Sequence, residues 1–266
     1  MPYDELLTLA LDAAQQAAEI LRSGFGHAVA DVGTKSSPTD MVSAMDRAAE
    51  ARISQVLAEH RPFDAVTGEE GTATAGTSGV RWVVDPLDGT TNYLMGIPAY
   101  SVSIAVEVDG SVVGGVVVDP SRDETWAAVH GGGASCNGRP LRLDGSECPE
   151  LATALIATGF SYLPQRRAEQ AAVLTRLLPE IRDIRRFGSA ALDLCWVAGG
   201  RFDGYYEWGV NEWDVAAGQL IATEAGAEST TLAGGGPMNG AVLATRPGLL
   251  GPLRTLLLHS GVASPT

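Results

Sequence analysis

The chain has 266 residues, of which 45% are hydrophobic and 19% charged, and its formal net charge at pH 7 is −14. This composition is typical of a globular protein with a sizeable core, and the negative charge argues against a nucleic-acid-binding surface, because phosphate backbones attract cationic side chains. No apolar run reaches the ~18 residues of a membrane-spanning helix, and the acidic, amphipathic start is unlike a signal peptide, so we expect a cytoplasmic protein that does not bind membranes.

The first part of the chain predicts helices followed by antiparallel strands. The segment KSSPTD (35–40) has the composition of a turn. The run VRWVV predicts a buried strand that stops at Asp85-Pro86, and Asp109-Gly110 predicts the turn of a hairpin. From apolar spacing and punctuation we expect helices at 4–24 and about 41–60, a loop at 71–79, and strands at 80–84, 100–108, 111–118 and 124–130.

After about residue 145 strands alternate with helices, which predicts an α/β layer. We expect strands at 152–160, 184–187, 202–208 and 241–245. We expect helices at about 165–179, 188–200, 213–226 and 247–259. The sequence therefore predicts an α+β half, 1–145, and an α/β half, 146–266, which form one compact unit.

Carboxylates stand beside turns and element ends in four separate segments. They are Asp46 on the second helix, Glu69 and Glu70 in TGEEG, Asp85 and Asp88 in DPLDGTT, and Asp214 in EWDVAAG. Like charges cannot lie close together unless they are protonated or bridged by cations. If the fold gathers these segments, divalent cations are the simplest explanation.

The kinds of side chain in these segments indicate which cation. All the candidate ligands are oxygens, and the histidines and cysteines lie elsewhere without the spacing of a zinc site or a CxxC pair. Hard oxygen ligands suit Mg²⁺ or Mn²⁺, and Mg²⁺ held by a few carboxylates and phosphate oxygens recurs in phosphoryl transfer. Gly89, Thr90 and Thr91 predict the start of a short helix whose free N–H groups would bind the phosphate.

Each of these residues also has a purely structural interpretation. Asp214 suits the first turn of a helix, Asp88 could cap a helix, and Asp46 could lie on a solvated helix face. Lys35 is the single lysine among 18 lysines and arginines, which either reflects codon preference or marks a place that needs a compact ammonium group. Only the conjunction of the segments points to a site.

The motifs GEE, WVVDPLDGTTN and WDVAAG, in this order, closely resemble the signatures of the inositol monophosphatase family. KSSPTD followed by Asp46, and the segment RRFGSAALDLCWVAGGRFDGYYE (185–207), resemble that family too, so the resemblance covers nearly the whole chain. It implies a layered αβαβα sandwich, usually a homodimer, with the site between its two halves. It also implies a Mg²⁺-dependent, lithium-sensitive phosphatase.

The resemblance implies a set of metal ligands. Glu69, Asp85 and the backbone carbonyl of Leu87 are expected to hold one ion. Asp85, Asp88 and Asp214 are expected to hold a second, and a third ion is expected to bind more weakly near Glu69. Two or three Mg²⁺ ions are therefore expected, with Mn²⁺ as an alternative.

The resemblance also implies how the reaction proceeds. Gly89 and Thr90 are expected to bind the phosphate through backbone N–H groups, and Thr90 and Glu69 to orient a water molecule that a metal ion activates. Asp46 is expected to support Thr90, and Lys35 to act electrostatically near the metal-bound waters. The water attacks phosphorus directly, so no covalent phospho-enzyme is expected.

For the substrate, the resemblance favours myo-inositol 1-phosphate. Glu207 in YYEWG, the backbone near Ala190, and Asp88 match positions that contact substrate, and DGTTNY resembles the inositol branch. An exposed glutamate at a strand end is the structural alternative for Glu207.

Fructose 1,6-bisphosphate and histidinol phosphate are the alternative substrates, and a regulatory relative that binds a protein partner is a third possibility. Several residues depart from the pattern of inositol phosphatases and put the substrate in question. They are Met95, Gly96, Phe160, Trp208, Asn211 and Glu212.

Overall fold

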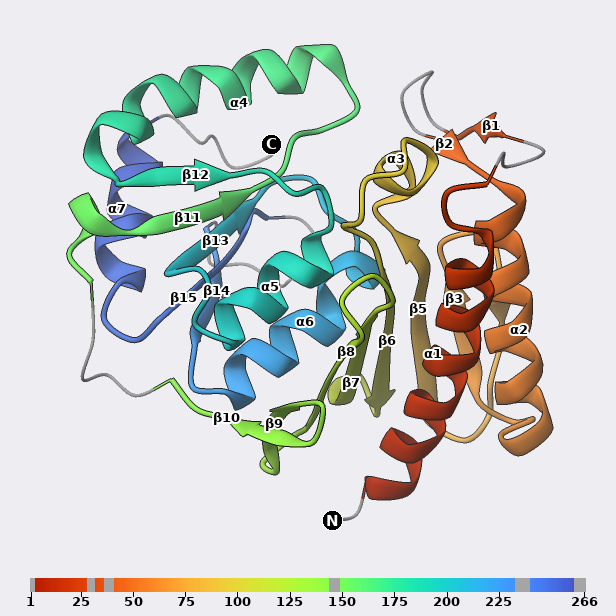
Figure 1. Ribbon diagram of the computed structural model, residues 1–266. Coiled ribbons are helices and arrows are strands. Elements are labelled where there is room, and N and C mark those ends of the chain that lie inside the picture. The colour runs from red at the N-terminus through yellow and green to blue at the C-terminus, as the bar shows by residue number, and fades with distance from the viewer. Residues whose placement is uncertain (1–2, 28–31, 36–40, 144–148, 233–239, 261–266) are drawn as a thin grey trace.

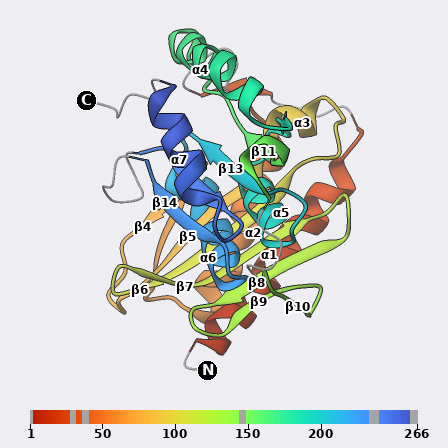
Figure 2. The same cartoon turned by 90° about the vertical axis from the view of Figure 1, so that its left-hand side faces the viewer.

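Helices and sheets alternate in five layers (Figure 1). The structure is a computed structural model that describes residues 3–27, 32–35, 41–143, 149–232 and 240–260. Helices α1 and α2 cover one face of the first sheet, α5 and α6 lie between the two sheets, and α4 and α7 cover the outer face of the second. Figure 2, viewed from the side of α7, shows the same order with α7 in front. The predicted αβαβα sandwich is confirmed.

The helices of the described residues agree with the predictions to within a few residues. The α-helices are α1 Asp4–Gly24, α2 Ala44–His60, α3 Thr90–Leu94, α4 Pro164–Leu177, α5 Ala190–Ala198, α6 Glu212–Glu224 and α7 Leu250–His259. Two 3₁₀ turns, η2 Leu151–Thr153 and η3 Leu178–Glu180, accompany them. Within these residues, no helix combines the length and the apolar character that crossing a membrane requires.

The first sheet has eight strands in the order β10-β9-β8-β7-β6-β5-β3-β4. Its strands are β3 Ala65–Gly68, β4 Ala73–Thr74, β5 Val80–Asp88, β6 Ser101–Val108, β7 Ser111–Asp119, β8 Glu124–Val129, β9 Gly133–Cys136 and β10 Arg139–Leu141. Neighbours are antiparallel except β3 and β5, which are parallel. Asp109 and Gly110 both have positive φ between β6 and β7, as the predicted hairpin turn requires.

The second sheet has five strands in the order β12-β11-β13-β15-β14. Its strands are β11 Leu155–Thr158, β12 Asp183–Arg185, β13 Gly204–Glu207, β14 Glu228–Thr231 and β15 Val242–Thr245. β12, β11 and β13 are parallel, whereas β15 is antiparallel to both β13 and β14. A separate pair, β1 Gly33–Thr34 and β2 Met41–Val42, precedes α2.

Strand β5 is buried on both faces, which explains its unbroken apolar run. Trp82 and Val84 face the core formed with α1 and α2, whereas Val83 faces the core formed with α5 and α6. On the opposite side of the first core, α1 presents an alanine face, which the buried Leu21 borders. Its members, all fully buried, are Ala10, Ala13, Ala14, Ala17 and Ala18.

Some predicted boundaries are wrong. β5 does not stop at Asp85-Pro86 but continues to Asp88, because its ladder with β6 is irregular between Asp85 and Asp88 and so leaves a place for a proline that cannot donate. The predicted strand 152–160 begins instead with a 3₁₀ turn, and the predicted loop 71–79 contains β4. Strands β1, β2, β3, β9, β10 and β14 were not predicted.

The proposed division of the chain at residues 145 and 146 lies outside the described residues and stays a prediction, as does most of the predicted turn 35–40. The strands of the first sheet precede this point and those of the second follow it.

Candidate active site

A cavity of about 290 Å³ lies where the ends of β5 and β13 meet the N-termini of α3, α5 and α6. The residues that line it are Glu69, Asp85, Leu87, Asp88, Gly89, Thr90, Phe160, Ser161, Tyr162, Leu163, Arg166, Arg186, Gly188, Ala190, Glu207, Trp208, Gly209, Val210, Asn211 and Asp214. The fold thus brings backbone N–H groups at helix starts to the same cavity as carboxylates from distant segments.

Four of the predicted carboxylates, Glu69, Asp85, Asp88 and Asp214, line this cavity. Burial raises the pKa of Asp85 well above its ordinary value, and the charges of Glu69, Asp88 and Asp214 raise it further. Burial likewise raises the pKa of Asp214, with Asp88 and Glu69 adding to the effect. Burial raises the pKa of Asp88 to about 7 against hydrogen bonds that favour its charged form. The four groups therefore repel one another.

Each of these aspartates is held by hydrogen bonds at one oxygen. Asp85 Oδ1 accepts the N–H of Leu87 at 3.0 Å. Asp88 Oδ2 accepts the hydroxyl of Ser189 at 2.7 Å and the N–H of Ala191 at 2.8 Å, so this residue also caps α5. Asp214 Oδ2 accepts the N–H of Asn211, the N-cap of α6, at 2.6 Å. The structural roles suggested for Asp88 and Asp214 are real, and both residues still line the cavity.

The chemistry of this donor set fits hard divalent cations. Its ligands are oxygens alone, with no histidine or cysteine in the cavity lining, and cations would relieve the repulsion that raises the pKa values. Within the described ranges, no three such side chains already form a cation-binding arrangement.

Gly89 and Thr90 form the start of α3, as predicted. Gly89 has φ +95°, and a Cβ there would lie 2.9 Å from the carbonyl oxygen of Ala99, so the turn requires glycine. The hydroxyl of Thr90 donates to Asp46 Oδ1 at 2.8 Å and approaches the carbonyl oxygen of Leu87 at 3.1 Å.

Asp46 does not lie on a solvated mid-helix face. It is fully buried at the third position of α2, where its Oδ2 accepts the N–H of the N-cap Ser43 at 2.9 Å. Its other oxygen, Oδ1, is the one that accepts the hydroxyl of Thr90. Asp46 is therefore outside the cavity but in contact with a residue that lines it.

Lys35 forms ion pairs at the edge of the site. Its Nζ lies 2.8 Å from Glu69 Oε1 and 2.5 Å from Glu70 Oε1. Burial acts to lower the pKa of Lys35, but the two carboxylates outweigh it and raise the pKa. Burial raises the pKa of Glu70 to about 7, although Lys35 opposes the shift. These ion pairs explain why a lysine is present at this position, which codon preference alone does not.

Glu207 ends β13 at the cavity wall and is not an exposed strand-end glutamate. Tyr205 donates its hydroxyl hydrogen to Glu207 Oε2 at 3.1 Å. Burial raises the pKa of Glu207 to about 7, while the charge of Arg186 and this hydrogen bond act in the opposite direction. Ala190, the first residue of α5, also lines the cavity.

Two arginines that the sequence motifs did not single out also line the cavity. Arg166 at the start of α4 and Arg186 before α5 both line it, and neither forms an ion pair with any described residue. The guanidinium carbon of Arg186 lies 6.0 Å from the ring centre of Phe160. The pair Arg185-Arg186 opens the motif RRFGSAALD, and a basic pair in such a motif was the sequence signal for a cationic group in the cavity.

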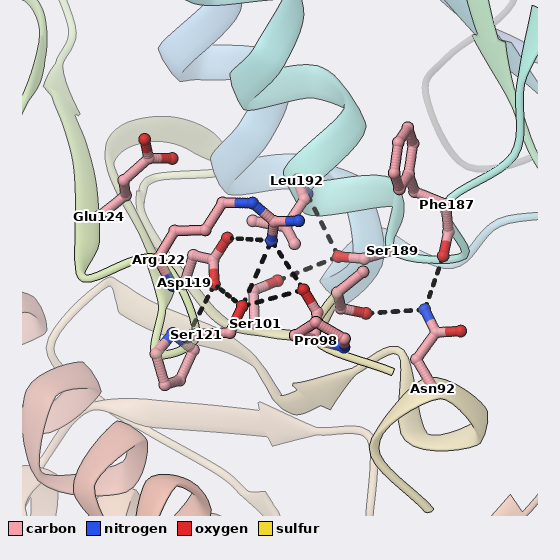
Figure 3. Close-up of polar contacts among 12 residues, drawn as sticks. Asn92, Pro98, Ser101, Asp119, Ser121, Arg122, Glu124, Phe187, Ser189 and Leu192 are labelled. Atoms are coloured by element: carbon pink, nitrogen blue, oxygen red, sulfur yellow. Dashed lines mark hydrogen bonds and ion pairs between the residues drawn. The ribbon is translucent and has the colours of Figure 1, made fainter. Parts of the chain in front are cut away.

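Ser189 and Asn92 were also missed. Ser189 Oγ lies 3.1 Å from Ser101 Oγ and accepts the N–H of Leu192 (Figure 3). Asn92 in α3 donates through Nδ2 to the carbonyl oxygens of Ala99 at 2.7 Å and Phe187 at 2.6 Å. Asn92 thus ties α3 to the segment that precedes α5, which explains the asparagine of DGTTN.

The residues that depart from the family pattern fall into two groups. Phe160, Trp208 and Asn211 line the cavity. Met95 is 63% exposed and, like Gly96, does not line it. Glu212 does not line the cavity either and forms an ion pair with Arg81.

The sequence matches a known protein family over nearly its whole length. Residues 3–263 match the sequence model of the inositol monophosphatase family. Inositol-1-monophosphatase SuhB of Mycobacterium tuberculosis H37Rv is 46% identical over 250 residues, which are 90% of this chain and 84% of that protein. Nus factor SuhB of Pasteurella multocida is 43% identical over 223 residues, which are 83% of each chain.

Solved structures resemble the fold over nearly the whole chain. The extragenic suppressor protein suhB of Bartonella henselae has a TM-score of 0.88 at 37% identity and covers 95% of this chain and 98% of that one. An IMPase of Thermotoga maritima has a TM-score of 0.86 at 29% identity, with 96% and 98% covered.

Proposed function

Because the chain belongs to the inositol monophosphatase family, we propose that it is a phosphoric monoester hydrolase that uses divalent cations to cleave myo-inositol 1-phosphate into inositol and phosphate. The observation that carries the proposal is the gathering of Glu69, Asp85, Asp88 and Asp214 around one cavity, beside helix N-termini. Mutually repelling carboxylates suit cations, and cations together with free N–H groups suit a phosphate ester.

The carboxylates divide into two sets in this proposal. Glu69, Asp85 and the carbonyl oxygen of Leu87 hold one Mg²⁺ or Mn²⁺ ion, Asp85, Asp88 and Asp214 hold a second, and a third binds more weakly near Glu69. When bound, the cations supply a water molecule of lowered pKa and offset negative charge on the phosphate and the leaving oxygen.

Thr90 and Glu69 orient the attacking water. Asp46 Oδ1 accepts the hydroxyl hydrogen of Thr90, which leaves the lone pairs of Thr90 Oγ1 to accept a hydrogen bond from the water. Glu69 accepts a second hydrogen bond from it. The N–H groups of Gly89 and Thr90 bind phosphate oxygens, and Lys35 offsets the charge of Glu69 and Glu70. Water attacks phosphorus directly, so no side chain is phosphorylated.

The polyol is recognised at the opposite wall. Glu207 accepts hydrogen bonds from substrate hydroxyl groups in its charged form, and Tyr205 holds one of its oxygens in place. Asp88 and the backbone at Ala190 contribute further contacts. This end of the cavity gives specificity for a hydroxylated ring.

A second candidate substrate, fructose 1,6-bisphosphate, is favoured by Arg166 and Arg186. Both line the cavity without an ion-pair partner among the described residues, and a second phosphate group is a ligand that guanidinium groups bind well. Histidinol phosphate has one phosphate and a cationic amino group, so it offers these arginines no second anionic group.

The family resemblance also supports a cytoplasmic homodimer that lithium inhibits. A regulatory protein that binds a partner is the less favoured alternative, and the name of the Pasteurella multocida relative, Nus factor, is its support. The full set of cavity carboxylates favours catalysis over binding alone.

The experiment that tests the proposal measures phosphate release by the purified protein with Mg²⁺. Inositol 1-phosphate, fructose 1,6-bisphosphate and histidinol phosphate are compared at equal concentrations. A preference for inositol 1-phosphate is expected. A preference for the bisphosphate would transfer the assignment to the second candidate, and no release from any ester would overturn the proposed catalysis.

Asp85→Asn separates catalysis from a binding-only role. Removal of a carboxylate shared by both cation sites is expected to lower kcat at least roughly 100-fold. Asp123→Asn is the control, because Asp123 is exposed and its left-handed backbone also suits asparagine. Turnover by Asp85→Asn that equals the control would contradict the assignment of Asp85.

A further inference from the structure

Helix α2 carries a second buried carboxylate one turn after Asp46. Glu50 is 4% exposed, and its spacing of four residues places it on the same helix face as Asp46. Asp46 contacts Thr90 in α3, so the first of these two carboxylates already touches the site. The contacts of Glu50, the second carboxylate, lie on the turn after β3.

Glu50 holds the turn that carries Glu69. Its Oε2 accepts the N–H of Glu70 at 2.8 Å, and its Oε1 accepts the N–H of Thr72 at 2.9 Å. The same turn is closed by the N–H of Gly68, which donates to the carbonyl oxygen of Thr72 at 2.7 Å. Both carboxylate oxygens are therefore used on one short turn after β3.

Gly68 lies directly against the carboxyl group of Glu50. A Cβ at Gly68 would lie 2.3 Å from Glu50 Oε2, so only glycine lets β3 end against the carboxylate. Glu50 forms no ion pair with any described residue, and a buried carboxylate without a counter-charge destabilises a fold unless hydrogen bonds compensate it. The two N–H groups of Glu70 and Thr72 supply that compensation, so the buried carboxyl group and the turn hold each other in place.

We propose that Glu50 is a positioning residue that fixes Glu69 at its distance from Thr90, with α2 as the rigid link between the two. At one end of this link Asp46 accepts the hydroxyl hydrogen of Thr90. At the other end Glu50 accepts N–H groups of the turn that carries Glu69. The inference rests on the proposed function, in which Glu69 is a cation ligand and orients the attacking water. Glu50 touches neither cation nor substrate.

The test measures Mn²⁺ binding to the purified full-length protein by electron paramagnetic resonance, beside the Mg²⁺ dependence of phosphate release. Glu50→Gln keeps the shape of the side chain but sets its NH₂ group against one backbone N–H donor. We expect Mn²⁺ affinity to fall roughly 10-fold to 100-fold, as for other residues that orient metal ligands. We expect kcat at saturating Mg²⁺ to fall roughly 10-fold as well, because in the proposed function Glu69 also orients the attacking water and is no longer held in place.

A second variant perturbs the contact between Glu50 and the turn after β3 but leaves the glutamate itself unchanged. In Gly68→Ala the new methyl group displaces Glu50 Oε2, and the same loss of Mn²⁺ affinity is expected. Circular dichroism establishes that each variant folds. If both variants fail to fold, Glu50 is structural and the proposal is overturned.

Glu224 supplies a matched control elsewhere in the molecule. Its two oxygens accept the N–H groups of Gly131 at 2.8 Å and Gly133 at 2.9 Å, so it holds a turn outside the cavity by the same two contacts, although its Oε1 also lies 3.6 Å from His130 Nδ1. Glu224→Gln is expected to leave Mn²⁺ binding unchanged. An equal loss of affinity in this control would overturn the proposal.

Unchanged Mn²⁺ affinity in Glu50→Gln and Gly68→Ala would overturn it as well. If the wild-type protein releases no phosphate from any ester, the proposed function fails, but the Mn²⁺ isotherms still decide whether Glu50 positions a cation ligand. The two failures are therefore distinguishable.

Discussion

Glu207 stands against Gly159, where a Cβ would lie 2.0 Å from its carboxylate oxygen Oε1. Glycine thus leaves room for a buried carboxyl group, and burial raises the pKa of that group from 4.5 to about 7. Between these two values the folded protein binds a proton that the unfolded chain has released. The free energy of unfolding therefore falls as the pH rises through this interval.

Glu207→Gln is expected to stabilise the protein at pH 8 while it weakens substrate binding. The gain is on the order of 2 kcal/mol, because glutamine has no charge to bury, and it should vanish near pH 4. Urea unfolding in the presence of a chelator at both pH values measures it. KM for inositol 1-phosphate should rise in the same variant, and a stability gain that is equal at both pH values would contradict the titration of Glu207.

Residues differ in how far the sequence identifies them. Glu69 and Asp85 stand in motifs whose order is specific, so their place at the cavity was predictable. Asp46 was taken for a mid-helix residue because the helix was started too early, although Ser43 followed three residues later by Asp46 is the pattern of a capping box. Glu50 and Arg186 act through distant partners, which spacing along the chain does not reveal.

At the scale of elements, the N-terminus of α6 is fastened to the first sheet by Arg81. This residue of β5 donates two hydrogen bonds to Glu212, the first residue of α6, at 2.9 and 2.7 Å. Its Nε donates to Glu107 of β6 at 2.7 Å. Asp214 lies two residues after Glu212, so the anchor of the helix also fixes the place of a cavity carboxylate.

Arg81→Met is expected to lower the free energy of unfolding by about 1 to 2 kcal/mol, because two largely buried carboxylates lose their partner while solvent still reaches part of the guanidinium. Arg185→Met, which breaks the exposed pair with Asp183, should change it much less, because water screens that pair. Urea titration of both variants makes the comparison. Equal effects would mean that Arg81 adds no more than a surface ion pair.

Long elements were predictable and short ones were not. The hairpin β6–β7 follows from two apolar runs around Asp109-Gly110, whose positive φ values favour aspartate and glycine. Strands β9, β10 and β14 have three or four residues each and partly exposed sides, so they carry no clear alternation. Pro86 argued against a continuing strand, but the irregular ladder around it removes the objection.

At the scale of the whole molecule, the cavity lies on the seam between two sheets. Contacts across this seam are polar at the cavity: Asp88 caps α5, and Asn92 holds the carbonyl of Phe187. Farther from it they are apolar, with Val83 and Trp126 in one core with α5, α6 and Tyr205. A ligand that binds in the cavity is therefore expected to stabilise both sheets and the helices between them.

Mg²⁺ is expected to raise the midpoint of thermal unfolding, and a chelator to lower it. Binding to the folded state alone adds about 2.7 kcal/mol when the free ion exceeds its Kd a hundredfold. Differential scanning calorimetry with and without Mg²⁺ measures the shift. Asp85→Asn should lose most of it, whereas equal shifts in wild type and variant would place the ion elsewhere.

The alanine face of α1 has a consequence for how this sequence can change. Five consecutive contact positions already hold the smallest residue with a side chain, all without exposed surface. Every substitution except glycine enlarges the side chain, and a larger group would push a helix of 21 residues away from its neighbours. Evolutionary change along this face is therefore open toward glycine and closed toward larger residues, and serine would in addition bury a hydroxyl group.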